Sequence, residues 1–191
     1  MISRRSILGG LALVAASRPL HAKDPEALNL AASEGDVALT RYAAEGSGKR
    51  AGVVVLHGAR GIELKPRAYE RYANALIAQG IDAYLIRYYS PVDDLAREKL
   101  TTSEARQAYQ AERFDAWTGR VSSAVTAILA RPDSSGRLGL LGFLLGGFVA
   151  AVAMGGLRPT LSDRLPTIGM TNTASILPRT GIQRYTSLEK P

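Results

Sequence analysis

Three stretches of the chain are largely apolar and short enough to be strands buried on both faces. They are Gly52–Leu56 (GVVVL), Ile81–Tyr88 (IDAYLIRY) and Leu138–Phe143 (LGLLGF). Runs of apolar residues without alternation are typical of central strands in a parallel sheet. A fourth stretch, Val37–Ala43 (VALTRYA), alternates loosely and runs into the glycine-rich segment AEGSGKR. It predicts a strand followed by a turn or hairpin-like connection.

Two segments between these strands carry the three- and four-residue spacing of amphipathic helices. The first begins at Pro66 and stops at Gly80, and the second ends at Pro132. Their apolar positions are Tyr69, Tyr72, Ala73, Leu76 and Ile77, then Phe114, Trp117, Val121, Val125, Ile128 and Leu129. The polar segment 91–112 is expected to be loop and helix over the surface. This alternation predicts an α/β fold, with a mostly parallel sheet covered by helices on both faces.

The pattern stops near Gly155. Segment 156–191 holds six threonines and four prolines, and no apolar run in it is longer than two residues. We therefore expect an irregular tail over 156–191, which leaves Leu138–Phe143 without a following strand to pair with. An uncovered apolar strand edge predicts poor folding and association with other chains. A damaged gene, or a reading-frame shift near Gly155, would produce such a tail.

The N-terminal segment 1–22 has the features of an export signal. Two arginines precede a short apolar stretch, Ile7–Ala16, and Ala22 is a small residue at which a peptidase can cut. The apolar stretch is too short to span a bilayer stably. Ser3–Leu8 (SRRSIL) resembles the twin-arginine signal, and an ordinary secretory signal is the alternative. Either signal predicts recognition by the export machinery and a periplasmic or secreted protein. The segment 23–155 that follows is expected to form a partial α/β domain.

The net charge of +7 is concentrated at the two ends of the chain. Three of the 24 basic residues lie in the first 22 positions and five lie in the last 36, which also hold two of the 17 acidic residues. The body between them is close to neutral, so it lacks the basic face that nucleic-acid binding requires. The chain has no cysteine, which excludes disulfides, thiolate metal sites and a cysteine nucleophile.

The segment Leu138–Gly147 (LGLLGFLLGG) combines an apolar strand, a tight glycine-flanked turn and the start of an apolar helix. This order is the setting of the G-x-S-x-G nucleophile elbow, in which a serine on a strained turn exposes its oxygen above the sheet. Here the flanking positions are Gly142, Phe143, Leu145 and Gly146, and the central position is Leu144. Leucine has no oxygen or thiol with which to attack a substrate.

Three motifs together resemble the dienelactone hydrolase family of α/β-hydrolases. They are VVVLHGARG with the helix after it, GIDAYLIRYYSP, and RLGLLGFLLGGFVAA, and the resemblance runs from about Val37 to Met154. The resemblance implies an α/β-hydrolase fold, incomplete in this chain. It also implies family chemistry on small molecules, in which a nucleophile, a histidine and an aspartate hydrolyse an ester or lactone bond.

The resemblance also implies an oxyanion hole of two backbone N–H groups, those of Leu145 and Ala59, with His57 and Gly58 shaping the loop. The family's histidine base follows later strands, but the chain's two histidines are His21, in the segment read as a signal, and His57. Asp163 is in no recognisable strand-end context. The nucleophile and the base are therefore both missing, and losing even one member of such a triad costs a factor of about 10⁴ to 10⁶ in turnover.

Other candidate residues have plainer interpretations. Ser134 and Ser135 are read as the turn before a strand, and Asp93 and Asp94 as a turn and helix N-terminus rather than an acid pair or metal site. Glu63 either faces a pocket or is a solvated loop charge. One loop histidine without cysteines or clustered carboxylates gives no metal site, and no cofactor is expected.

We therefore expect an exported protein of the dienelactone hydrolase type that is inactive as written. Two alternatives stay open. In the first, the retained loop and elbow bind a small molecule through its carbonyl or anionic group without cleaving it. In the second, the chain is a nonfunctional fragment of a damaged gene.

Overall fold

The computed structural model describes residues 24–32, 35–161 and 168–171. Its elements along the chain are β1 (Glu26–Leu30), β2 (Val37–Tyr42), β3 (Arg50–Leu56), α1 (Pro66–Ile77), β4 (Asp82–Arg87), α2 (Pro91–Lys99), α3 (Ser103–Leu129), β5 (Ser134–Phe143), α4 (Leu145–Leu161) and β6 (Ile168–Thr171). The segment read as an export signal, and Asp163 with most of the tail, lie outside the described residues.

The strands form one sheet in the order β1-β2-β4-β3-β5-β6. The four strands from β4 to β6 run parallel, while β2 pairs antiparallel with β4 and β1 pairs antiparallel with β2. The prediction of a mostly parallel α/β sheet is confirmed. The antiparallel strand β1 was not predicted, because EALNL has only three apolar residues and lies at the sheet edge, half exposed.

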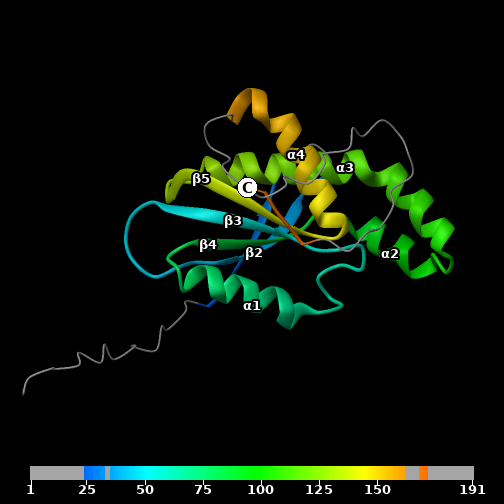
Figure 1. The fold of residues 1–191 in the computed structure, drawn as a ribbon, viewed down its shortest axis with the longest axis horizontal. Coiled ribbons are helices and arrows are strands. Elements are labelled where there is room, and N and C mark those ends of the chain that lie inside the picture. The colour runs from blue at the N-terminus through cyan, green and yellow to red at the C-terminus, as the bar shows by residue number, and fades with distance from the viewer. Residues whose placement is uncertain (1–23, 33–34, 162–167, 172–191) are drawn as a thin grey trace, which may run out of the picture.

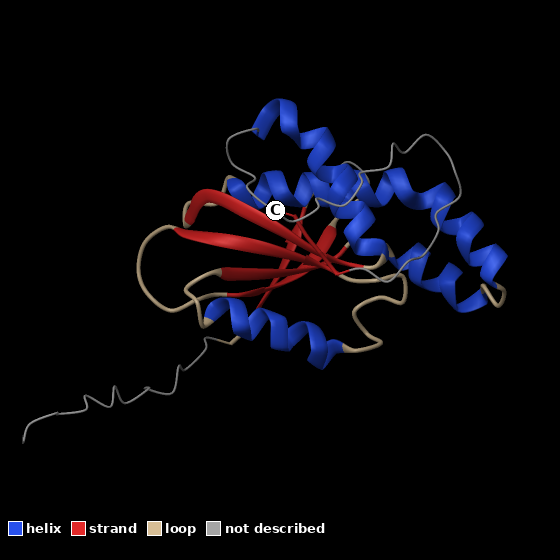
Figure 2. Ribbon diagram, viewed as in Figure 1, coloured by secondary structure: helices blue, strands red, loops and turns tan. Residues whose placement is uncertain are grey.

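Helices cover both faces of the sheet (Figures 1 and 2). The larger core joins side chains of β2, β3, β4 and β5 to α3 and α4, around Trp117, Val121, Val125 and Val149. The smaller core packs α1 through Ala73 against Val55, Ala83 and Leu85. Alternate residues of β3 and β4 thus point into opposite cores, which is why these strands read as continuously apolar. No helix in the described ranges is long and apolar enough to cross a membrane.

The expectation that β5 has no following strand is wrong. Helix α4 continues through Gly155 as far as Leu161, and β6 then pairs with β5 in parallel, from Leu140 opposite Ile168 to Phe143 opposite Thr171. Glycine lowers helix propensity without forbidding a helix, so Gly155 and Gly156 do not end α4. The four-residue strand IGMT is too short to give a recognisable pattern. The apolar edge of β5 is therefore paired with β6. The expectation of poor folding rested on an unpaired edge, so it loses its basis.

Candidate active site

The turn between β5 and α4 has the backbone geometry of a nucleophile elbow. Leu144 has a φ of 53°, and it is the one residue other than glycine with positive φ in the described part of the chain. This left-handed conformation costs a leucine about 1 to 2 kcal/mol relative to ordinary backbone. The side chain is 42% exposed, although most large apolar side chains in the sheet are buried. The elbow therefore presents residue 144 outward, as it would a nucleophile.

Two glycines let the helix approach the strand closely enough to make this turn. A Cβ on Gly142 would lie 2.5 Å from Gly147 Cα and would also overlap the carbonyl of Gly146. A Cβ on Gly146 would lie 2.5 Å from the carbonyl oxygen of His57 and 2.7 Å from that of Leu56. Since these are backbone atoms, no side-chain rotation can relieve either clash. The glycines are thus required by the packing of α4 against β5 and β3.

The loop after β3 lies beside the elbow. Strands β3 and β5 are parallel neighbours with Leu56 opposite Gly142, so their carboxyl ends meet at the same edge of the sheet. A Cβ on Gly58 would come within 3.5 Å of Leu144 Cδ1. The structure therefore brings together the residues that the sequence singled out, namely His57, Gly58 and Ala59 on one side and Leu144 and Leu145 on the other.

Three tyrosine hydroxyls fix the backbone of this loop. Tyr88 donates to the carbonyl of His57 at 2.7 Å, and Tyr89 donates to the carbonyl of Ala59 at 3.1 Å. Tyr69, from α1, accepts the N–H of Gly58 at 3.1 Å. The sequence analysis missed this arrangement, which we call the tyrosine clamp. Its one sequence signal is the pair Tyr88-Tyr89 directly after a buried strand.

The tyrosine clamp leaves the Ala59 N–H available. The Gly58 N–H is taken by Tyr69, whereas the Ala59 N–H has no acceptor among the described residues. Leu145 is the first residue of α4, so its N–H has no partner within the helix and lies at the positive end of the helix dipole. Two such donors can bind a carbonyl oxygen or an oxyanion. Their assignment as an oxyanion hole stays a prediction.

His57 is unsuited to act as a general base. Its side chain is 2% exposed, it stacks on Tyr88 with ring centroids 4.0 Å apart, and its Nδ1 donates to the Gly58 carbonyl at 2.9 Å. Burial lowers the pKa of His57 to about 4, so the ring is neutral at physiological pH. A neutral, stacked imidazole is suited to shaping the loop, and this role of His57 stays a prediction.

Because the pKa of His57 is lowered from 6.5 to about 4, its burial should make folding sensitive to mild acid. The stabilisation is complete above pH 6.5 and is lost progressively as the pH falls toward 4, since the unfolded chain takes up the proton first. We expect a loss of about 2 kcal/mol in the free energy of unfolding between pH 7 and pH 5. Urea unfolding at several pH values measures it.

The matched comparison is His57→Gln, whose unfolding free energy should change much less over this range. Direct titration of the His57 ring by NMR provides a second measurement that does not depend on the variant folding. A His57 pKa above about 6, or the same pH slope in both proteins, would contradict this account.

The remaining candidates do not join the elbow. Ser134 and Ser135 are the first two residues of β5, at the opposite end of the strand from the elbow, where their hydroxyls accept the N–H groups of Gly136 and Arg137. Asp93 is buried at the N-terminus of α2 and accepts from Ser90, Tyr109 and Arg113. Asp94 pairs with Arg97. The reading of Asp93 and Asp94 as helix-start residues is confirmed, whereas Ser134 and Ser135 belong to the strand itself and not to a turn before it. The described residues contain no group of three or more His, Asp or Glu placed to hold a metal.

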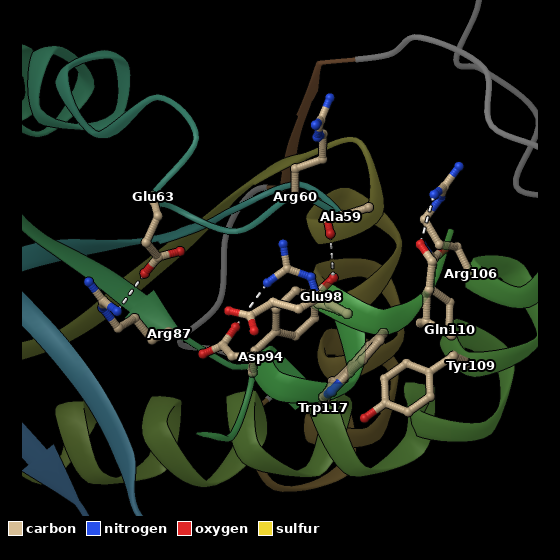
Figure 3. A pocket seen from close by; sticks show the side chains of 13 residues that line it. Ala59, Arg60, Glu63, Arg87, Asp94, Glu98, Arg106, Tyr109, Gln110 and Trp117 are labelled. Atoms are coloured by element: carbon tan, nitrogen blue, oxygen red, sulfur yellow. Dashed lines mark hydrogen bonds and ion pairs between the residues drawn. The ribbon is translucent and has the colours of Figure 1, made fainter. Parts of the chain in front are cut away.

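A cavity of about 860 Å³ opens beside the Ala59 loop (Figure 3). Its walls come from this loop, from the end of β4 and from helices α2 and α3. Glu63 lines the cavity and forms an ion pair with Arg87 at 2.5 Å. Its side chain is also half exposed, so Glu63 both faces a pocket and is a solvated loop charge. The cavity gives a small molecule access to the loop that carries the Ala59 donor.

No family model and no curated protein matches the chain. Among solved structures, it resembles a dienelactone hydrolase from Anabaena variabilis with a TM-score of 0.59 and 19% identity over 78% of this chain and 62% of that one. It also resembles a dienelactone hydrolase-like promiscuous phosphotriesterase from metagenomic libraries, with a TM-score of 0.56 and 21% identity over 77% of this chain and 59% of that one. An α/β serine hydrolase without a lid from Xanthomonas campestris is similar as well. Its TM-score is 0.51, with 18% identity over 74% of this chain and 60% of that one. The chain thus spans less than two thirds of these proteins.

Proposed function

Because the chain has, over part of its length, an α/β-hydrolase fold like that of the dienelactone hydrolases, we propose that it derives from an enzyme of small-molecule esters or lactones and does not itself hydrolyse them. The observation that carries the proposal is Leu144, which occupies the outward, positive-φ position of the elbow. The positive φ and the two closely packed glycines support this proposal, and the reactive atom is missing.

In an active elbow, the side chain at 144 would attack the substrate carbonyl while the N–H groups of Leu145 and Ala59 hold the developing oxyanion. A histidine would take the proton from the nucleophile and return it to the leaving group. In this chain, Leu144 cannot attack, and His57 is stacked and hydrogen-bonded away from such a role. Binding of a carbonyl group survives in this scheme, whereas both covalent steps are lost.

A nitrophenyl acetate assay tests this proposal. We expect the chain to release nitrophenolate no faster than a denatured control. Since the chain has no cysteine, Leu144→Cys introduces a single thiol at the elbow, beside the N-terminus of α4, which favours the thiolate. We expect this variant to release one equivalent of nitrophenolate and then stop, because no base activates water for deacylation.

Leu64→Cys is the matched control, because Leu64 is a similarly exposed leucine, at 50%, in the loop before α1. Its thiol should be acylated at least about 10-fold more slowly, since neither a helix N-terminus nor the oxyanion donors act on it. Turnover by the unmodified chain that is abolished by His57→Gln would overturn the proposal. Equal rates for the two cysteine variants would show that the elbow lacks its donors.

A second candidate function is a binding protein, and the tyrosine clamp specifically favours it. The clamp holds the Ala59 loop in place without any contribution from residue 144, so the donor remains oriented although the nucleophile is absent. The adjoining cavity offers room for the rest of a ligand. Ligand-dependent thermal stabilisation without consumption of the ligand supports this function, and its absence across esters, lactones and organic acids counts against it.

A further inference from the structure

The elbow adjoins an apolar surface formed by α1 and the end of β5. Phe143 ends β5 directly before Leu144, and the rings of Tyr69 and Tyr72 pack against it, with ring centroids 5.4 Å and 4.8 Å away. Tyr72 is 45% exposed and Leu144 is 42% exposed, while Tyr69 and Phe143 are partly exposed. We call these four residues the elbow patch. It presents aromatic and aliphatic atoms to solvent directly beside the elbow.

Gly58 connects the elbow patch to the two N–H donors of the site. Its own N–H donates to the Tyr69 hydroxyl at 3.1 Å, and a Cβ built on Gly58 would come within 3.5 Å of Leu144 Cδ1. Ala59 is the residue after Gly58, and Leu145 is the residue after Leu144. Each donor therefore lies one residue, about 3.8 Å between Cα atoms, from a residue at this contact. A ligand whose carbonyl oxygen accepts from the donors can thus extend an alkyl chain over the elbow patch.

The surroundings of the elbow patch favour an uncharged chain. The residues three and four positions from Tyr72, which are its neighbours on the helix surface, are all uncharged: Ala68, Tyr69, Ala75 and Leu76. The cavity toward α2 and α3 differs, because seven of its thirteen lining residues are charged (Figure 3). Covering those groups with an alkyl chain would cost part of their hydration, whereas covering the elbow patch removes apolar area from water.

We propose that the elbow patch binds the alkyl chain of an ester or lactone whose carbonyl oxygen accepts from the N–H groups of Ala59 and Leu145. This inference names a ligand class for the binding function proposed above and rests on it. It also gives Leu144 a part in binding, because a leucine at the outward position of the elbow enlarges the apolar surface next to the donors.

The test uses γ-nonalactone, a lactone with a pentyl side chain, and two analogues that each lack one part of it. γ-Butyrolactone has the same ring without the chain, and 2-pentyltetrahydrofuran has the same ring and chain without the carbonyl oxygen. Isothermal titration calorimetry measures the three affinities. We expect saturable binding of γ-nonalactone and at least about 10-fold weaker binding of γ-butyrolactone, which buries less apolar area. 2-Pentyltetrahydrofuran should bind at least about 5-fold more weakly, since it cannot accept the two hydrogen bonds at a carbonyl.

Methyl NMR locates the bound chain without any substitution. The Leu144 methyl signals should shift with occupancy by γ-nonalactone, because this side chain belongs to the elbow patch. The methyl signals of Leu95, which is 60% exposed on α2, should stay unchanged. Equal shifts at the two leucines would show general adsorption to exposed apolar side chains and would overturn the proposal.

Four variants test the elbow patch itself. Tyr72→Ala and Leu144→Ser should each weaken γ-nonalactone binding by at least about 3-fold, because each removes apolar contact area. Tyr72→Phe should bind within about 2-fold of the unmodified chain, since the ring and not the hydroxyl contacts the ligand. Leu95→Ala is the matched control and should leave binding unchanged, because Leu95 is an exposed leucine outside the elbow patch. Alanine favours a helix and Tyr72 is half exposed, so Tyr72→Ala should leave α1 intact, which circular dichroism checks.

The proposal is contradicted if the three ligands bind equally, or if Leu95→Ala weakens binding as much as Tyr72→Ala does. No saturable binding of γ-nonalactone below about 5 mM also contradicts it. Chromatography of the lactone after the titration separates this inference from the proposed function. Conversion to the hydroxy acid by the unmodified chain would overturn the proposed lack of hydrolysis, whereas equal binding of the lactone and its chain-free analogue would overturn this inference alone.

Discussion

Replacing Gly146 with alanine is expected to lower the free energy of unfolding by at least about 3 kcal/mol. The added Cβ would lie 2.5 Å from the carbonyl oxygen of His57 and 2.7 Å from that of Leu56, so α4 must move away from β3. That movement would also displace Leu145 relative to the Ala59 loop. Chemical denaturation measures the stability, and the Leu144→Cys acylation rate, repeated in the Gly146→Ala background, measures the damage to the elbow.

Gly155→Ala is the matched control, because Gly155 lies in the same helix and a Cβ added there would meet nothing within 4 Å. There alanine should stabilise the chain by about 0.5 to 1 kcal/mol through its higher helix propensity. If the two substitutions had similar effects, the close approach of α4 to β3 would not be a property of the protein in solution.

The second large effect is expected at the other end of the sheet, where Asp82 binds two arginines. Its carboxylate accepts from Arg41 at 2.6 Å, from Arg50 at 2.8 Å and from the N–H of Ala44 at 2.9 Å, and its side chain is 3% exposed. Asp82→Ala should therefore cost about 3 to 5 kcal/mol in unfolding free energy, because it leaves the buried guanidinium of Arg41 undercompensated. Urea unfolding at neutral pH measures the loss.

Glu26→Gln is the control for this prediction, since Glu26 contacts the same Arg41 at 3.3 Å but is half exposed. Its loss should cost less than about 1 kcal/mol.

Burial alone would raise the pKa of Asp82, but the hydrogen bonds from Arg41, Arg50 and Ala44 lower it overall. The stabilisation by Asp82 is thus present at neutral pH and is lost only as the pH falls below 3.8, the ordinary pKa, which separates it from the effect of His57. Equal costs for Asp82→Ala and Glu26→Gln would contradict the buried network.

The sequence predicted the elements whose signals are local. Short stretches of sequence were enough to predict the apolar strands β3, β4 and β5 and the amphipathic helices α1 and α3. The order of strand, glycine turn and helix located the elbow at Leu144. Strands β1 and β6 were missed because they are short edge strands, which are stabilised by pairing with β2 and β5 rather than by their own pattern.

Contacts between distant residues account for what the sequence could not predict at the site. Tyr88 was read as the end of a strand and Tyr89 as the residue after it, and nothing in their spacing indicates that their hydroxyls reach back to His57 and Ala59, about 30 residues away. The same holds for the cavity, whose lining is assembled from one loop, the end of a strand and two helices. The sequence shows which side chains are present, whereas the tertiary structure determines which groups those side chains contact.

The tyrosine clamp has a consequence for how such a chain behaves in a cell. The hydroxyls of Tyr69, Tyr88 and Tyr89 hold the Ala59 loop through contacts that do not involve residue 144. Serine and leucine both bear the cost of the left-handed backbone there, so exchanging one for the other has little influence on the proportion of folded molecules. Cellular abundance follows the proportion of folded molecules and their escape from proteolysis. Selection for abundance therefore does not distinguish a nucleophile from a leucine at this position, and immunological detection of the protein is no measure of its catalytic capacity.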